Sequence, residues 1–236
     1  MSLTRYGFKE WFIISLVAAL LAAGVVWLQW WWVLAPIALA WLAFVAFFRD
    51  PWGRHPATSS PNDMVSPADG KVSAVLQVDN HPATDGPATI VRIFLSVLDV
   101  HLNRFPCDGV VVEVIYTPGK YLDARTEESA KVNESLLTVL QIASGERIGV
   151  RQVSGAIARR IVCPLQPGNR ARRGARFGMI KFGSTTELIL PRPKDVRTHV
   201  RVGDRVTGGV TILATLAAPA ATASAAPAAP SAATER

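Results

Sequence analysis

One stretch of the sequence constrains the fold more than any other: residues 11–48 contain no charged side chain. A helix crosses the hydrocarbon core of a bilayer with about 20 residues, so this stretch is too long for a single crossing. It divides near residues 27–33, where Gln29 lies among tryptophans. Tryptophan favours the boundary between membrane and water, which suits the tip of a hairpin. We therefore expect residues 1–50 to form an N-terminal membrane hairpin of two apolar helices.

The basic residues beside this stretch predict its orientation. Arg5 and Lys9 precede the first arm, Arg49 and Arg54 follow the second, and no Lys or Arg lies between them. Because cytoplasmic flanks carry the excess of Lys and Arg, both ends should lie in the cytoplasm. The following domain then sits on the cytoplasmic face of the cell (inner) membrane. Two alternatives are open: a cleaved signal peptide, which leaves the second arm unexplained, and a re-entrant hairpin that dips into one leaflet.

The composition of the whole chain narrows the class of partner. The 236 residues carry a formal net charge of +7, and the two cysteines, Cys107 and Cys163, belong to no paired motif. A basic excess favours an anionic partner, and the apolar segment makes an anionic membrane the better candidate. Nucleic acid is not expected as a partner, because aromatic residues do not interleave with the basic ones. We expect reduced thiols and no metal site.

The body of the chain, residues 51–216, has the pattern of a β protein. Short runs rich in Val and Ile are separated by Gly, Pro, Asp and Asn, and they predict strands over residues 64–78, 88–98, 109–117, 135–143, 147–155, 177–183, 186–191 and 208–216. No long amphipathic helix alternates with them, which argues against a parallel sheet. The predicted fold class is mainly β, a barrel or sandwich like a hybrid barrel, with one helix over residues 158–165. Residues 217–236 are rich in Ala, Pro and Ser and predict a disordered tail.

Two polar residues of the body are candidates for acid–base chemistry. Asp69 lies in SPADGKV, where Pro, Asp and Gly also suit an ordinary turn. His101 lies in LSVLDVHLNRFP, at the end of a strongly patterned strand, and is the best-placed general acid or base of four histidines. A lone histidine in an apolar strand is more often structural, so both residues also have a purely structural interpretation.

A basic run precedes the most unusual step of the sequence, Gly183-Ser184. Such runs are usually solvated faces, but beside an anionic leaflet each basic side chain contributes roughly 1 kcal/mol of attraction. The candidates for binding lipid or a substrate phosphate are Arg172, Arg173, Arg176 and Lys181. Ser184 is by default a turn residue, and a reactive hydroxyl needs a base from elsewhere in the fold. No G-x-S-x-G elbow surrounds it, and spacing alone does not decide whether Asp69, His101 and Ser184 form a triad.

Taken together, four blocks of the sequence resemble the phosphatidylserine decarboxylase proenzymes in their short bacterial and archaeal form. The blocks are SPADGKV, LSVLDVHLNRFP, YTPGKYLDA with KVNES, and SGAIARRIVCPLQPGNRARRGARFGMIKFGSTTELILP. The last block, with its Gly-Ser-Thr step, is highly specific. The order of the blocks and the preceding hairpin strengthen the match, which covers most of residues 10–215.

The resemblance implies that the chain cuts itself between Gly183 and Ser184. An acyl shift to the serine oxygen, elimination and hydrolysis would leave a β chain of residues 1–183 and an α chain of residues 184–236, with Ser184 converted to a covalent pyruvoyl cofactor. The two chains should stay associated, and a homo-oligomer is compatible with the sequence. The pyruvoyl group would form a Schiff base with phosphatidylserine and act as the electron sink while carbon dioxide leaves, giving phosphatidylethanolamine.

The resemblance also assigns residues. The family's self-cleaving Asp corresponds to Asp69, its serine to Ser184 and its histidine strand to His101. Longer members usually carry H-x-x-H, whereas this chain has HLNR, with Arg104 at the second position. His101 is therefore a candidate for self-cleavage, for decarboxylation or for both.

Two other functions compete with this one. SPADGKVSAV and VRVGDRVTGGVTIL look like the halves of a biotinyl/lipoyl-like module, which suits a membrane-tethered adaptor without enzymatic activity; the expected carrier lysine motif is missing. A membrane hydrolase that uses Ser184 as its nucleophile is the third hypothesis.

Overall fold

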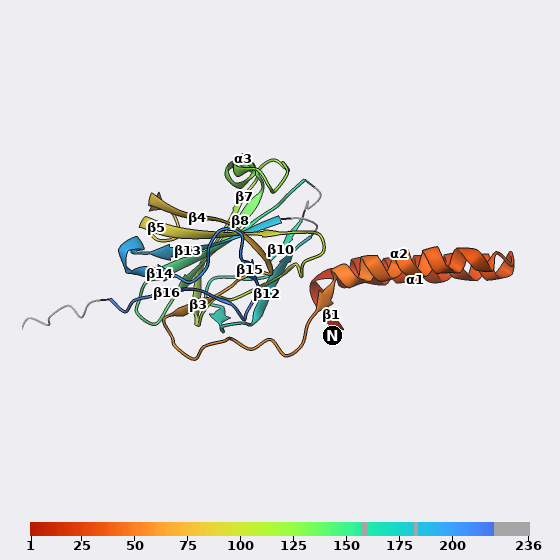
Figure 1. The fold of residues 1–236 in the computed structure, drawn as a ribbon, viewed down its shortest axis with the longest axis horizontal. Coiled ribbons are helices and arrows are strands. Elements are labelled where there is room, and N and C mark those ends of the chain that lie inside the picture. Colours follow the sequence, from red (N-terminus) through yellow and green to blue (C-terminus); the bar gives the residue numbers. More distant parts are fainter. Residues whose placement is uncertain (157–159, 182–183, 220–236) are drawn as a thin grey trace, which may run out of the picture.

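A computed structural model of the chain describes residues 1–156, 160–181 and 184–219 (Figure 1). Its helices are α1 (Phe8–Trp27), α2 (Leu34–Phe47) and α3 (Glu127–Val132), with the short 3-10 helices η1 (Arg5–Gly7), η2 (Trp31–Val33) and η3 (Pro193–Asp195). The strands are β1 (Ser2–Leu3), β2 (Arg49–Asp50), β3 (Asp63–Val65), β4 (Gly70–His81), β5 (Gly86–Leu95), β6 (Leu102–Arg104), β7 (Gly109–Thr117), β8 (Ser135–Gln141), β9 (Arg147–Val153), β10 (Ile161–Val162), β11 (Arg170–Ala171), β12 (Arg176–Ile180), β13 (Ser184–Pro191), β14 (Val196–Thr198), β15 (Arg205–Val206) and β16 (Ile212–Leu216).

One large antiparallel sheet organises the body. Its strands follow the order β11-β7-β8-β9-β13-β5-β4-β15, so β13 lies between β9 and β5. Two smaller sheets, β10-β12-β6 and β14-β16-β3, complete the body, and β1 pairs with β2. The sheets enclose one main core that contains Val91, Leu140, Val150, Leu188 and Leu213, drawn from five strands. This mainly β architecture confirms the predicted fold class.

The residues form strands because apolar and polar side chains alternate where one face is buried. In β7, Val111 is fully buried while Val110 and Val112 are more exposed. In β13 all eight residues are buried, which fits a strand at the centre of a sheet that is covered on both faces.

The N-terminal hairpin projects from the body as a pair of antiparallel helices (Figure 1). The Trp41 indole N–H donates to the Ser15 hydroxyl across the pair, at 3.0 Å. Within the described residues, the segment Arg5–Trp27 is long and apolar enough to cross a membrane, whereas the helix over Trp31–Phe47 is shorter. Most apolar side chains of both arms face outward, which is the arrangement that a lipid environment favours.

The base of the hairpin packs tightly on the body. Phe47 and Phe48, at the end of α2, form a cluster with Val100, Leu102 and Met179. The Thr4 amide donates to the Phe48 carbonyl, which also fixes the start of the chain. Through Leu102, this apolar cluster joins the base of the hairpin to β6, the strand that follows His101.

The predicted helix over residues 158–165 is wrong in its described part. Ile161–Val162 form β10, which pairs with Ile180 and Met179 of β12. Pro164 has no amide hydrogen to continue a helical ladder, and pairing with β12 satisfies the backbone instead. Sequence reasoning also missed α3, which is capped by Thr126: its side chain accepts a hydrogen bond from the Ser129 amide.

The packing of the hairpin base predicts a large effect from one substitution. Phe48→Ala removes a fully buried ring and should lower the free energy of unfolding by about 3–5 kcal/mol. Urea unfolding of the full chain in detergent measures this loss. The matched control is Phe12→Ala, because Phe12 is 52% exposed on α1 and should lose much less. Equal losses in the two variants would contradict a docked hairpin base.

Candidate functional site

Ser184 is the first residue of β13 and lies opposite Leu95 of β5. It is completely buried, and within the described residues its hydroxyl oxygen has no hydrogen-bond partner. An unsatisfied buried hydroxyl costs about 1–3 kcal/mol, so the Ser184 hydroxyl is a candidate for a further partner or a reaction. The other residue of the predicted cleavage site, Gly183, lies outside the described residues.

The chain changes sheets immediately before Ser184. It leaves the three-stranded sheet at the end of β12 and enters the large sheet as β13. On the first side, the Ile180 amide donates to the His101 carbonyl and the Lys181 amide to the Arg160 carbonyl, both at 3.2 Å. The Lys181 ammonium also pairs with the Glu10 carboxylate of α1 at 2.5 Å. The described chain is thus held by the three-stranded sheet up to Ile180 and by the large sheet from Ser184 onward.

His101 lies beside this crossing, directly before β6. Its ring is fully buried and packs against the Phe47 ring, with 4.4 Å between the centroids. Its Nδ1 lies 2.9 Å from the Asp99 carbonyl oxygen. A carbonyl oxygen only accepts, so Nδ1 carries the hydrogen and Nε2 keeps its lone pair.

Burial lowers the pKa of His101 to about 4. The apolar surroundings disfavour the imidazolium, while the hydrogen bond and charge of Asp99 and the charge of Asp69 act in the opposite direction. His101 is therefore neutral at physiological pH, which is the form that a general base requires.

Asp69 is held by other partners in the turn before β4. Both carboxylate oxygens accept from the Arg54 guanidinium, at 2.5 and 2.6 Å, and one also accepts from the Gly208 amide at 2.8 Å. The charge of this carboxylate nevertheless reaches His101, because it raises the pKa of that residue. Asp69 directly precedes β4, whose Lys71 pairs with Phe94 of β5, and Ser184 pairs with the next residue of β5, Leu95, so Asp69 lies at the Ser184 end of the large sheet.

A buried amide network lies next to Ser184, and the sequence did not point to it. The Asn103 side chain of β6 donates to the Thr186 hydroxyl at 3.0 Å and accepts from the Gln152 amide at 2.8 Å. These bonds join β6, β9 and β13. The sequence HLN held one signal for this network. Residues two apart on a strand face the same side, so Asn103 was expected to share a face with the candidate residue His101.

Arg104, at the position where longer relatives have a second histidine, has a structural environment. It is buried, donates to the Gly174 carbonyl at 2.9 Å and pairs with Asp50 at 3.2 Å. Asp50 also accepts from Arg176 at 2.8 Å. These contacts join the chain that leaves the hairpin to β6 and β12.

The predicted lipid-binding residues differ in solvent exposure and in the hydrogen bonds that their side chains already make. Arg173 donates to the carbonyls of Thr58 and Ser60, and the bonds of Arg176 and Lys181 to carboxylates are described above. Arg172 is exposed to solvent. A role in lipid binding stays a prediction for all four residues, of which Arg172 and Arg176 are exposed, Arg173 is half-buried and Lys181 is buried.

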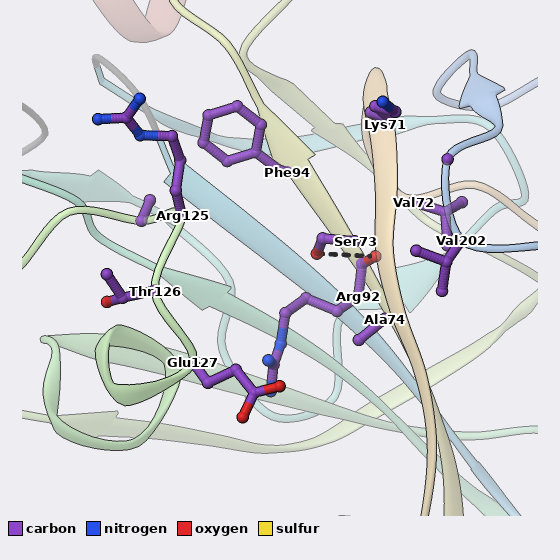
Figure 2. A pocket seen from close by; sticks show the side chains of 12 residues that line it. Lys71, Val72, Ser73, Ala74, Arg92, Phe94, Arg125, Thr126, Glu127 and Val202 are labelled. Atoms are coloured by element: carbon purple, nitrogen blue, oxygen red, sulfur yellow. Dashed lines mark hydrogen bonds between the residues drawn. The ribbon is translucent and has the colours of Figure 1, made fainter.

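A cavity of about 340 Å³ lies on the far face of the large sheet. One of its walls is Phe94, which pairs with Thr185 and so faces away from the side of Ser184. Figure 2 shows Arg125, just before α3, and Glu127, its first residue, facing Phe94 and Arg92 of β5. Cationic side chains thus line a partly apolar cavity near the Ser184 end of β13.

Comparison with known proteins identifies the family. A sequence model described as phosphatidylserine decarboxylase matches residues 41–214. A phosphatidylserine decarboxylase proenzyme of Rhodopirellula baltica is 41% identical over 212 residues, which cover 89% of this chain and 86% of that protein. The chain belongs to the phosphatidylserine decarboxylase family. A proenzyme of that name from Symbiobacterium thermophilum is 43% identical over 201 residues, covering 85% of this chain and 92% of that protein.

Membership of the phosphatidylserine decarboxylase family confirms the resemblance inferred from the four sequence blocks. The family consists of decarboxylases, so it favours an enzyme over the adaptor module and over the serine hydrolase. The matched region begins within α2 and ends in β16, so it contains the residues assigned from the sequence: Asp69, His101, Gly183 and Ser184.

The lowered pKa of His101 predicts a loss of stability in acid. The unfolded chain takes up this proton near pH 6.5, whereas the folded chain resists it until pH about 4. The unfolded state then binds more protons, so stability falls as the pH drops through this window, by about 3 kcal/mol in total.

His101→Asn should remove this component from the pH dependence of the free energy of unfolding. Urea unfolding at several pH values between 7 and 4 measures it, in a Ser184→Ala background that keeps the chain continuous. The control is His199→Asn, because the His199 ring bonds the Thr215 hydroxyl at an exposed site. An unchanged slope in the His101 variant would show that His101 is not the group responsible.

Proposed function

We propose that this chain is the proenzyme of a membrane-bound decarboxylase that converts phosphatidylserine to phosphatidylethanolamine and carbon dioxide. The observation that carries the proposal is the fully buried Ser184 hydroxyl at the start of the central strand β13, in a chain of this family. This hydroxyl is positioned by β5 and β9 and makes no hydrogen bond to the rest of the described chain. It is thus available to react with the peptide that precedes it.

The proposed maturation uses the chain's own residues. The Ser184 oxygen attacks the carbonyl carbon of Gly183, and the acyl group moves from nitrogen to oxygen. His101 accepts the serine proton at Nε2, the Asp69 carboxylate stabilises the imidazolium that forms, and the proton passes to the nitrogen of residue 184 as its bond to Gly183 breaks. The resulting ester loses the α-proton of residue 184 and expels the Gly183 carboxylate, and hydrolysis of the dehydroalanine that remains releases ammonia. The products are a β chain of residues 1–183 and an α chain of residues 184–236. They stay together because β13 remains paired with β5 and β9 of the other chain.

A pyruvoyl group derived from Ser184 fits this position, since the buried hydroxyl has no other role in the described structure. Its carbonyl would supply an electron sink for decarboxylation. The strand pairs with Leu95 and Val153 would hold the peptide that bears it, and the buried surroundings exclude water. Neutral His101 can take up a proton at Nε2 and return it to the substrate carbon after carbon dioxide has left.

The N-terminal hairpin supports a location of this chemistry at a lipid surface. We propose that residues 1–50 anchor the protein in the cell (inner) membrane with the domain of residues 51–216 on the cytoplasmic side. The contact between Phe47 and His101 supports this arrangement, because it puts the end of the apolar helix α2 beside the reactive centre. Arg172 and neighbouring basic residues would add attraction to an anionic leaflet. The proposed disordered tail, residues 217–236, lies almost entirely outside the described residues.

Replacement of Ser184 tests the reaction directly. The wild-type chain should appear as two fragments by intact mass spectrometry, with the mass of the smaller one shifted by conversion of its N-terminal serine. Ser184→Ala should remain a single chain and lose all decarboxylase activity, because it lacks the attacking oxygen. Ser144→Ala is the matched control, since Ser144 is exposed in the turn between β8 and β9.

A wild-type protein that stays a single chain with an ordinary serine would refute the proposal, as would activity that survives Ser184→Ala. Labelling by a fluorophosphonate probe would support the serine hydrolase instead. Inactivation by borohydride that requires an amine substrate would support the decarboxylase.

A further inference from the structure

The register of the large sheet places two more polar residues in line with Ser184. Thr185 pairs with Val153 of β9, so the preceding residue, Ser184, lies opposite the following one, Ser154. Ser135 of β8 also pairs with Val153, and the Ser154 amide donates to the Glu134 carbonyl at 2.9 Å. Glu134, Ser154 and Ser184 therefore form one row across three neighbouring strands.

The side chains of this row point to the same face of the sheet, because directly opposed residues share a face. The next row on that face contains Gln152 and Thr186, which both bind Asn103 of β6. Since His101 lies two residues before Asn103, the row faces the element that carries the proposed base.

All three members of the row have a buried side-chain oxygen without a hydrogen-bond partner in the described chain. These oxygens are Glu134 Oε2, Ser154 Oγ and Ser184 Oγ. Glu134 is only 7% exposed and Ser154 is fully buried. Within the described residues no cation pairs with the Glu134 carboxylate. A buried carboxylate without a cation is costly, and it suits a site whose cation arrives with the ligand.

We propose that Glu134 and Ser154 form the subsite that receives the primary ammonium group of the substrate headgroup. This inference rests on the proposed function and assigns a binding role that the family resemblance left open. A primary amine is protonated at neutral pH, and it becomes a nucleophile only after losing a proton. Glu134 accepts that proton from the ammonium nitrogen and becomes a neutral carboxylic acid, while the nitrogen regains its lone pair. The Ser154 oxygen accepts a second N–H hydrogen bond.

The spacing of the row suits this transfer. Neighbouring strands lie about 4.8 Å apart, so Ser154 stands one strand from Ser184 and Glu134 stands two strands away. An amine held over Ser154 is within reach of the longer Glu134 side chain on one side and of residue 184 on the other. The cavity of Figure 2 is less suited to an ammonium group, because Lys71, Arg92 and Arg125 line it.

Glu134→Gln in the full chain tests the proposal, because it keeps the size of the side chain and removes its charge. Intact mass should still show two fragments, since self-cleavage does not require the ammonium site. The value of kcat/KM for phosphatidylserine in mixed micelles should fall roughly tenfold to a hundredfold, as expected when a hydrogen-bonded charge is lost. Glu134→Asp should recover part of the loss. Ser135→Ala is the matched control, because Ser135 is buried on the opposite face of β8 and should behave as wild type.

A binding measurement separates recognition of the ammonium group from turnover. Calorimetric titration of the cleaved protein should show that Glu134→Gln weakens binding of glycerophosphoethanolamine and leaves binding of glycerol 3-phosphate, which lacks the ammonium, unchanged. Equal weakening of both ligands, or wild-type behaviour in both assays, would overturn the proposal. If the Gln variant fails to cleave, Ser154→Ala provides the same comparison. Failure of the proposed function is recognised separately, since the wild-type chain would then neither split nor release carbon dioxide.

Discussion

The pairing of β13 with β5 on one side and β9 on the other sets the position of Ser184 and of the polar row beside it. It fixes Ser184 opposite Leu95, and through β9 it lines Ser184 up with Ser154 and Glu134. The backbone hydrogen bonds of a central strand are well protected from water, so the reactive residue needs no support from its own side chain. That side chain can therefore stay unpartnered within the described structure, at a cost that the surrounding ladder offsets.

A second constraint comes from the hairpin, whose base is part of the core around His101. Phe47 touches the imidazole, Phe48 packs on Leu102, and Glu10 holds Lys181 just before the crossing between sheets. The proposed membrane anchor and the proposed reactive centre thus share side chains. A lipid headgroup at the membrane surface would meet the site at the foot of the hairpin, where apolar contact and neutral histidine lie together.

The sequence predicted the large-scale organisation well and the fine structure of the site poorly. Alternating Val and Ile runs revealed the main strands, because burial of one face imposes a period of two. Asp69, His101 and Ser184 were found through turn residues, a strand end and a family resemblance, and in the structure Asp69 lies at the Ser184 end of the large sheet while its charge raises the pKa of His101. The amide network of Asn103, Gln152 and Thr186 and the Arg54 pair of Asp69 were missed, because they join residues far apart in sequence. The helix predicted around Pro164 failed because pairing with β12 outweighed local propensity.

The central position of β13 in the large sheet affects how the protein can refold after the proposed cleavage before Ser184. The segment after Ser184 supplies β13 to the large sheet and β14 and β16 to a smaller one, so the body can assemble only with both halves present. A continuous chain finds its partner strand by an intramolecular search. A protein cut before Ser184 would have to do so by collision of two molecules, at a rate that depends on concentration. Cleavage would then make unfolding irreversible. The uncleaved proenzyme can refold after unfolding, whereas the two chains of the mature protein, once separated, would not reassemble at a useful rate.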